Sequence, residues 1–362
     1  MRRSGNEKRK RKNLPPIAAL LLALVILAGA FTGCSVKEQA PDDGRMKVVT
    51  TIFPPYDFAR AISGNGELAH VRMLLKPGEE IHSYEPTPLD IKEIQNCDLF
   101  IYVGAENDVW VDRILENMGD HKPQTLKLVE ITDTVAEEIV EGMMEERGHD
   151  HDHSHEEEHD HEHEGEEPEH INGGDSSHEE HEEADEHVWT SPVKAAEITE
   201  AIAQKMAEID PENAKAYLAN AKAYEEQILE VDRQFEEIVQ SAERRTIVFG
   251  DRFPVRYFAE RYGLDYYAAF PGCSSESEPS ASTLAFLIDK VREEKIPVVF
   301  SIEFSNGNIA RAICESTGAV RRTFYSCHNV TREQMESGAT YVSMMTENLE
   351  VIREALGGGD KK

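Results

Sequence analysis

A tract at residues 145–187 concentrates the side chains that bind metal ions. It holds eleven of the chain's fifteen histidines, together with twenty Asp or Glu and a single Arg. Imidazole nitrogens and carboxylate oxygens at this density are ligands for borderline divalent cations, and zinc is first among them. We expect low-affinity metal binding at His149, His151, His153, His155, His159, His161, His163, His170, His178 and His181.

The same tract is too polar to fold alone. Residues 149–186 contain almost no aliphatic or aromatic side chains, so burial of apolar surface cannot offset the loss of chain entropy on folding. We therefore predict a disordered insertion over residues 145–186. An acidic low-complexity run can also serve only as a solvating linker, but the density of histidine favours metal capture.

Two histidines stand where ordered structure is expected. His82 lies in the 77–86 segment, whose Pro and Gly residues indicate a loop between an apolar run and a helix start. His187 lies in the 185–192 segment, where the polar tract gives way to Trp189 and a Pro at the start of a helix. A lone histidine is more often a surface or core residue than a ligand. Two of them in structured loops beside a histidine-rich tract indicate a metal site.

Short apolar runs alternate with amphipathic segments in both halves of the chain, which predicts an α/β fold with parallel sheets. The predicted strands are 47–53, 68–75, 99–104 and 125–131 in the first half, and 246–250, 264–270, 297–303 and 320–326 in the second. We predict helices over 88–95, with Thr87 as N-cap and Asp90 three residues later, and over 281–294 and 332–356. Ligand sites in such folds lie at the carboxyl ends of the strands.

Two more helices are predicted between the halves. Residues 192–209 form the first, Asp210 and Pro211 interrupt, and residues 211–241 form the second. At 1.5 Å per residue the second helix is roughly 45 Å long, which fits a rigid strut spanning two lobes better than a helix inside one small domain. Its apolar residues recur every three or four positions and predict one buried stripe: Ala214, Tyr217, Leu218, Ala221, Tyr224, Ile228, Val231, Phe235 and Ile238.

The first 34 residues have the pattern of a lipoprotein signal peptide. A basic segment at 8–12 precedes an apolar stretch at 17–30 and a small-residue end at Cys34. Residues 31–34 resemble a bacterial lipobox, in which Cys34 is diacylated and becomes the mature N-terminus, although Phe31 stands where Leu is usual. The apolar stretch is shorter than the ~20 residues of a spanning helix, which argues against an uncleaved anchor. We predict a tether at 35–45 and an outward-facing protein.

The charge of the chain indicates which partners it can bind, and its cysteines indicate which disulfides it can form. The formal charge is −32, and the chain outside the tract and leader is still acidic, which disfavours nucleic acid and favours cations. Besides the predicted lipidation site, four cysteines remain: Cys97, Cys273, Cys314 and Cys327. An even number in an exported protein permits disulfides. Cys273 and Cys327 both follow predicted strands, so their bridge is the favoured pairing, although spacing alone does not determine it.

The two histidine loops resemble those of the zinc and manganese solute-binding proteins of ABC importers. The matching motifs are His-Ser-Tyr-Glu-Pro-Thr-Pro at 82–88 and Asp-Glu-His-Val-Trp-Thr-Ser-Pro at 185–192, together with the acidic insertion, the long helix and the lipobox. The likeness runs from about residue 47 to residue 356 and is strongest to the ZnuA-like zinc-binding lipoproteins.

The resemblance implies a TroA-like fold. We expect two α/β lobes, each with a mainly four-stranded parallel sheet flanked by helices, joined by a backbone helix. One metal ion should bind in the cleft, and the motion between lobes should be smaller than in sugar-binding relatives. We accordingly place the N-terminal lobe at 46–190, which includes the insertion, the connecting helices at 191–242 and the C-terminal lobe at 243–358.

The resemblance also implies a ligand set. His82 and His187 match the first two metal ligands of the family. The third is commonly a His, or a Glu in manganese binders, just after the first strand of the second lobe. Here that stretch, residues 249–254, contains no His. Asp251 is its nearest group able to coordinate, but Arg252 could instead neutralise Asp251 in an ion pair.

The fourth family position is a carboxylate near the last strand, and it falls at residues 325–329. His328 is the only histidine in the predicted C-terminal lobe, and it follows a predicted strand. We therefore predict His328 as a ligand, and Cys327 is a weaker candidate. Three histidines completed by Asp251 or water suit tetrahedral zinc, whereas manganese prefers more oxygen ligands. Glu85 or Glu303 could orient the ring nitrogens, and the sequence assigns neither.

The expected function is that of an extracytoplasmic zinc receptor, a monomer held at the membrane by lipid on Cys34, which delivers Zn²⁺ to an ABC permease. Manganese is the alternative cargo. A surface zinc buffer or adhesion lipoprotein without a transport role is the rival, and it would need the tract but no ordered cleft. No G-x-x-x-x-G-K-[ST] loop occurs, so we expect a separate subunit to hydrolyse ATP.

An enzyme is disfavoured. Residues 155–159 satisfy the H-E-x-x-H pattern of zinc proteases. That motif needs a stable helix to hold both imidazoles on one face, and this occurrence lies in a glutamate-rich run without an apolar stripe. Composition alone therefore explains it.

Overall fold

The structure is a computed structural model that describes residues 43–81, 84–104, 108–119, 122–143, 184–272, 274 and 278–357. The predicted signal peptide, its lipidation site Cys34, His82, Cys273 and the ten tract histidines from His149 to His181 lie outside these residues. The described strands and helices all belong to one compact unit, Arg45–Lys362. Among the helices in these ranges, none has both the length and the hydropathy that a membrane span requires.

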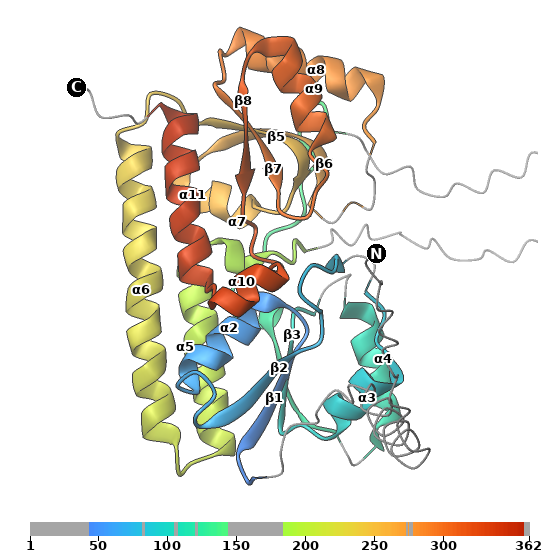
Figure 1. Ribbon diagram of the computed structural model, residues 1–362, viewed down its shortest axis with the longest axis vertical. Helices are drawn as coiled ribbons and strands as arrows, with labels where there is room; N and C mark the ends of the chain where they lie inside the picture. The colour runs from blue at the N-terminus through green and yellow to red at the C-terminus, as the bar shows by residue number, and fades with distance from the viewer. Residues whose placement is uncertain are drawn as a thin grey trace, which may run out of the picture. The chain divides into compact units, whose positions relative to one another are not determined.

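Each lobe is built on a four-stranded parallel sheet (Figure 1). The first sheet has the order β2-β1-β3-β4, with β1 (Met46–Thr50), β2 (Ala69–Met73), β3 (Leu99–Tyr102) and β4 (Gln124–Lys127). The second has the order β6-β5-β7-β8, with β5 (Thr246–Phe253), β6 (Asp265–Pro271), β7 (Val298–Ile302) and β8 (Val320–Phe324). The central strands β3 and β7 are buried along their whole length, as expected for parallel sheets covered on both faces. All eight predicted strands and the predicted fold class are confirmed.

Two predicted strands end three or more residues earlier than expected. The 47–53 strand stops at Thr50, and α2 (Phe53–Ile62) begins at Phe53, because Pro54 and Pro55 fit the first turn of a helix but cannot donate to a sheet. The predicted 125–131 strand stops at Lys127 and is followed by a 3-10 helix, Leu128–Glu130. Both changes occur at the carboxyl edge of the first sheet, where the chain must turn away from it.

The remaining helices of the first lobe are α3 (Pro88–Gln95) and α4 (Val109–Asn117). The capping box predicted for α3 is present: the Thr87 hydroxyl accepts from Asp90 N, and the Asp90 carboxylate accepts from Thr87 N at 2.9 Å. These bonds satisfy backbone donors that the first helical turn would otherwise leave without partners. They fix where the 76–87 connection ends.

Two long helices, α5 (Pro192–Ile209) and α6 (Ala214–Gln240), join the lobes, and α6 runs beside both of them in Figure 1. Asn220 Nδ2 on α6 donates to the carbonyl of Ile62 in the first lobe, and Asp232 on the same helix binds Arg261 of the second lobe at 2.7 Å. The predicted strut is therefore confirmed, at 27 residues or roughly 40 Å. Most of its predicted buried stripe is confirmed too, but Leu218 is exposed.

The second lobe adds α7 (Arg256–Tyr262), α8 (Ala281–Glu293), α9 (Asn308–Thr317), α10 (Arg332–Ser337) and α11 (Tyr341–Leu356). The single helix predicted over 332–356 was wrong. Gly338 has φ +78°, which ends α10, and Thr340 begins α11 with its own capping box.

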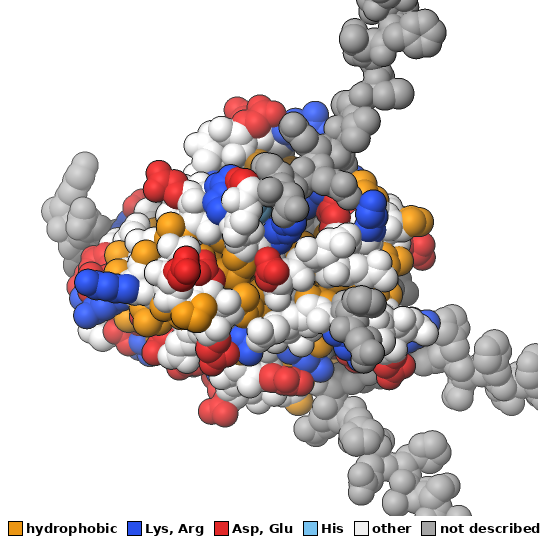
Figure 2. All heavy atoms as spheres, turned by 90° about the horizontal axis from the view of Figure 1, so that it is seen from below, with side chains coloured by type: hydrophobic (Ala, Val, Ile, Leu, Met, Phe, Trp, Pro, Cys, Tyr) orange, Lys and Arg blue, Asp and Glu red, His pale blue; other side chains and the backbone are white. Residues whose placement is uncertain are grey.

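On the face drawn in Figure 2, Lys and Arg side chains are scattered among Asp and Glu instead of forming one basic patch.

Candidate metal centre

His187 lies at the start of the segment that leads into α5, followed by the 3-10 helix Val188–Thr190. Its ring is fully buried. Asp185 Oδ1 accepts from both the backbone N and Nδ1 of His187, each at 2.8 Å. Asp185 is in turn placed by the Tyr257 hydroxyl, which donates to its carbonyl at 2.6 Å. With Nδ1 donating to a carboxylate, Nε2 is the nitrogen of His187 that can bind a metal.

The charge of Asp185 also acts on the protonation of the ring. Burial disfavours the imidazolium, but the charge of Asp185 and its hydrogen bond outweigh burial, so the pKa of His187 is raised. Within the described part of the chain, His187 Nε2 is buried and has no hydrogen-bond partner. A buried polar nitrogen without a partner costs about 1–3 kcal/mol. A bound cation would supply that partner.

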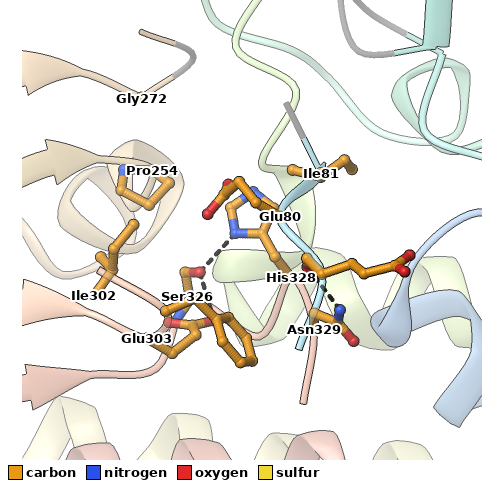
Figure 3. A pocket seen from close by; sticks show the side chains of 11 residues that line it. Glu80, Ile81, Pro254, Gly272, Ile302, Glu303, Ser326, His328 and Asn329 are labelled. Carbon is orange, nitrogen blue, oxygen red and sulfur yellow. Dashed lines mark hydrogen bonds between the residues drawn. The ribbon is translucent and has the colours of Figure 1, made fainter. Parts of the chain in front are cut away.

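His328 follows β8 in the second lobe and is almost fully buried. Ser326 Oγ lies 2.6 Å from its Nδ1 and donates to Glu303 Oε1 at 2.8 Å, while Ser326 N donates to Glu303 Oε2 at 2.7 Å (Figure 3). Since the hydroxyl proton is directed to the carboxylate, Ser326 Oγ accepts from Nδ1–H. Nε2 is again the nitrogen able to coordinate. Burial raises the pKa of Glu303 to about 7, although its bonds from Ser326 lower it.

The two imidazoles converge from the two lobes. Their ring centroids are 4.7 Å apart at an interplanar angle of 78°, and the Trp189 ring packs edge-on against both. Trp189 Nε1 also donates to the Ser326 carbonyl at 2.9 Å, which ties the His187 segment to the loop that carries His328. The convergence is therefore built into the packing between the lobes.

A small cavity lies beside the His328 ring. It is lined by Glu79, Glu80, Ile81, Pro254, Gly272, Ile302, Glu303, Phe304, Ser326, His328 and Asn329 (Figure 3). Its volume is about 10 Å³, which is close to the space of one water-sized sphere. Gly272 joins His187 to the same wall, because a Cβ there would lie 3.1 Å from His187 Cε1. A space of this volume is enough for one ion.

Asp251 is not brought together with the two histidines. It lies where the register between β5 and β6 shifts, between Phe249 and Arg252, and such bulges turn a side chain in a new direction. Its carboxylate accepts from Arg252 N at 2.9 Å and from Ile302 N at 3.3 Å. Burial raises the pKa of Asp251 even though these bonds lower it. The Arg252 side chain lies 3.3 Å from Glu80 of the first lobe.

Of the four predicted ligands, the described residues bring two side chains together, those of His187 and His328. Among them, no group of three or more His, Cys, Asp or Glu side chains is placed to hold a metal. The predicted ligand His82 falls outside the described residues. Of the two carboxylates suggested for orienting a ring, Glu303 acts on His328 through Ser326, whereas Glu85 is exposed and lines a different pocket.

Sequence reasoning missed Asp185 and Ser326. Asp185 belongs to the predicted histidine motif, but its role was hidden because it is one of twenty acids in residues 145–187. Ser326 carried no signal of its own, since its role depends on a carboxylate from another strand. The predicted disulfide is not supported: Cys327 is a free, buried thiol, and Cys273 lies outside the described residues.

Comparisons with known proteins found a family model, related sequences and similar folds. The profile of the family described as "Zinc-uptake complex component A periplasmic" (ZnuA) matches residues 48–355. The chain is 30% identical over 344 residues to the zinc-binding lipoprotein AdcA of Streptococcus pneumoniae strain R6, covering 95% of this chain and 61% of that protein. It therefore spans about three fifths of the length of the AdcA proteins.

A second relative matches over nearly its whole length. The high-affinity zinc uptake system protein ZnuA of Bacillus subtilis is 28% identical over 338 residues, covering 93% of this chain and 96% of that protein. Among solved structures, the Zn(II)-bound ZnuA-like domain of Streptococcus pneumoniae AdcA superposes with a TM-score of 0.65 at 25% identity. That match covers 86% of this chain and 99% of that domain.

Proposed function

This chain belongs to the ZnuA family of zinc-uptake complex components, and we propose that it is an extracytoplasmic receptor that captures Zn²⁺ between its two lobes and delivers it to the permease of an ABC importer. One observation carries the proposal. Two imidazoles from opposite lobes pack against each other beside a cavity of about single-ion size that His328 lines, and each Nδ1 is hydrogen-bonded to a carboxylate, directly or through a hydroxyl. That arrangement is typical of histidine ligands of zinc.

The residues present fit zinc as cargo. Neutral imidazoles are ligands that zinc binds readily, and Asp185 and Glu303 bring negative charge behind them without occupying coordination positions. His82 is the third ligand of this proposal. Asp251 or a water completes a tetrahedron, and Asp251 already accepts one backbone hydrogen bond at each carboxylate oxygen. Manganese is the weaker alternative, because it prefers more oxygen ligands.

The predicted tract is proposed to collect zinc near this centre. Asp185 N donates to the Val135 carbonyl at 2.9 Å, and Ala136 pairs with Ala184, so the described chain on the two sides of the tract comes together next to His187. Zinc held by the tract would be released within a short distance of the cavity. Lipid on Cys34 would keep the loaded receptor near its permease and raise their effective concentration.

A zinc-buffering or adhesion lipoprotein without a transport role remains the second candidate. It needs the tract but not the pair of supported imidazoles, and that pair favours the receptor. The family comprises receptors that bind solutes instead of transforming them, so no catalytic step is assigned.

The test is zinc titration by competition with a chromophoric chelator. In one variant a short Gly-Ser linker replaces residues 148–182, which leaves Asp185 and its support of His187 in place. If the protein is a receptor, one tight zinc site survives in this variant. The same site is lost in His187→Ala, whose tract still binds several zinc ions weakly. Loss of all tight binding on removal of the tract would favour the buffer.

A further inference from the structure

The loop that carries His328 is bonded to the first lobe by a buried amide. Asn329 is 1% exposed. Its Nδ2 donates to the carbonyls of Lys76 at 2.7 Å and Glu79 at 2.9 Å, and its Oδ1 accepts from Val330 N at 2.8 Å. Both carbonyls belong to the 76–81 loop that follows β2. Glu79, Glu80 and Ile81 of that loop line the same cavity as His328 and Asn329 (Figure 3).

A backbone bond joins the same two loops, since Gly78 N donates to the Val330 carbonyl at 2.9 Å. A second bond ties the His328 loop to α2, because Phe53 N donates to the His328 carbonyl at 3.1 Å. Gly78 has φ +86°, a conformation that glycine adopts without strain and that lets this loop turn its amide toward Val330. We call the bonds of Asn329 and Gly78 to the opposite loop the interlobe clamp.

Only a short primary amide meets all the requirements of the clamp. It supplies two N–H donors for two carbonyls and one acceptor for a backbone amide. Aspartate would place a second acceptor against the carbonyls of Lys76 and Glu79, and alanine would leave them with fewer donors. Glu80 of the same loop also forms an ion pair with Arg252 of β5, and its carboxylate is 37% exposed. Exposed ion pairs contribute little, so Asn329 is the stronger connection.

We propose that Asn329 is a positioning residue for zinc capture. It fixes the 76–81 loop, which leads directly into His82 in the sequence, against the loop of His328. Two walls of the cavity then form one rigid unit before the metal arrives. This inference rests on the proposed zinc function and deepens it. A rigid wall lowers the ordering cost of binding, so loss of the clamp weakens zinc binding chiefly by raising the dissociation rate.

The test compares Asn329→Ala and Asn329→Asp with Asn220→Ala. Asn220 is a matched control, because its Nδ2 also donates to a carbonyl of a distant segment, Ile62, at 3.0 Å, but it lies on α6 and does not line the cavity. We expect the zinc Kd of Asn329→Ala to rise about tenfold, from loss of two ordinary hydrogen bonds. Asn329→Asp should be weaker still, and Asn220→Ala should bind zinc like the wild type.

Amide hydrogen exchange on the zinc-free wild type supplies a second readout that does not depend on a variant folding. The clamp predicts that the Gly78 amide is protected without zinc and that Asn329→Ala removes this protection. Unprotected Gly78 in the zinc-free wild type would overturn the inference. So would unchanged zinc affinity in a folded Asn329→Ala. If the wild type itself lacks a tight site, the proposed zinc function fails, which is a different result.

Discussion

His187 is held by a carboxylate of its own segment, whereas His328 is held by a carboxylate from a neighbouring strand through an intervening hydroxyl. Asp185 bonds the His187 ring directly at 2.8 Å. Glu303, which follows β7, reaches the His328 ring only through Ser326, which follows β8. The first support is local in sequence, and the second needs two strands of the folded second lobe. The two halves of the metal centre should therefore respond differently to substitution.

The largest effect is expected for the direct support. Asp185→Ala removes the acceptor of a fully buried Nδ1–H, so the His187 ring loses both its orientation and its favoured tautomer. We expect the zinc Kd to rise by about 10- to 100-fold, the usual range for a residue that holds a metal-binding histidine. Competition with a chromophoric chelator measures it. The exposed Asp133 is the control, and Asp133→Ala should leave the Kd unchanged.

A smaller effect is expected for the relay. Ser326→Ala removes the hydroxyl between Glu303 and His328, but Ser326 N still donates to Glu303, so the carboxylate stays in place. The zinc Kd should rise by about tenfold or less. ¹⁵N NMR of the zinc-free protein should show His328 losing its single tautomer while His187 keeps its own. Ser337→Ala, at an exposed hydroxyl, is the control. A rise in zinc Kd for Ser326→Ala larger than that for Asp185→Ala would contradict the expected order of the two supports.

A third buried carboxylate separates stability from zinc binding. Asp108 accepts from Val103 N and Gly104 N, and burial raises its pKa to about 7 from 3.8, although these bonds lower it. A raised pKa means that the folded state holds the proton more tightly. The contribution of Asp108 to the free energy of unfolding is complete below pH 3.8. This contribution is lost as the pH rises from there through 7, by up to about 4 kcal/mol.

Asp108→Asn should remove that pH dependence and leave the zinc Kd unchanged, since Asp108 contacts neither ring. Urea unfolding of the zinc-free protein at pH 5 and pH 8 measures it. The stability difference between variant and wild type should grow in favour of the variant at the higher pH. An equal difference at both pH values would contradict the assignment.

The sequence predicted the architecture better than the centre. Apolar runs located all eight strands, and the signal is continuous in β3 and β7, which are buried along their whole length. The break between α10 and α11 was missed, since Gly338 stands in an otherwise helical pattern. His187 and His328 were predicted as ligands, and the structure brings them together. The roles of Ser326 and Asn329 and the bonds of Asp251 depend on contacts between segments distant in sequence, which no local pattern records.

Anomalous diffraction at the zinc edge, from crystals of the zinc-loaded protein, tests the central claim most directly. We predict one fully occupied ion bonded to Nε2 of both His187 and His328 at about 2.0–2.1 Å, with both Nδ1 atoms still hydrogen-bonded as described here. A tight ion that contacts only one of these rings, or none, would contradict the account.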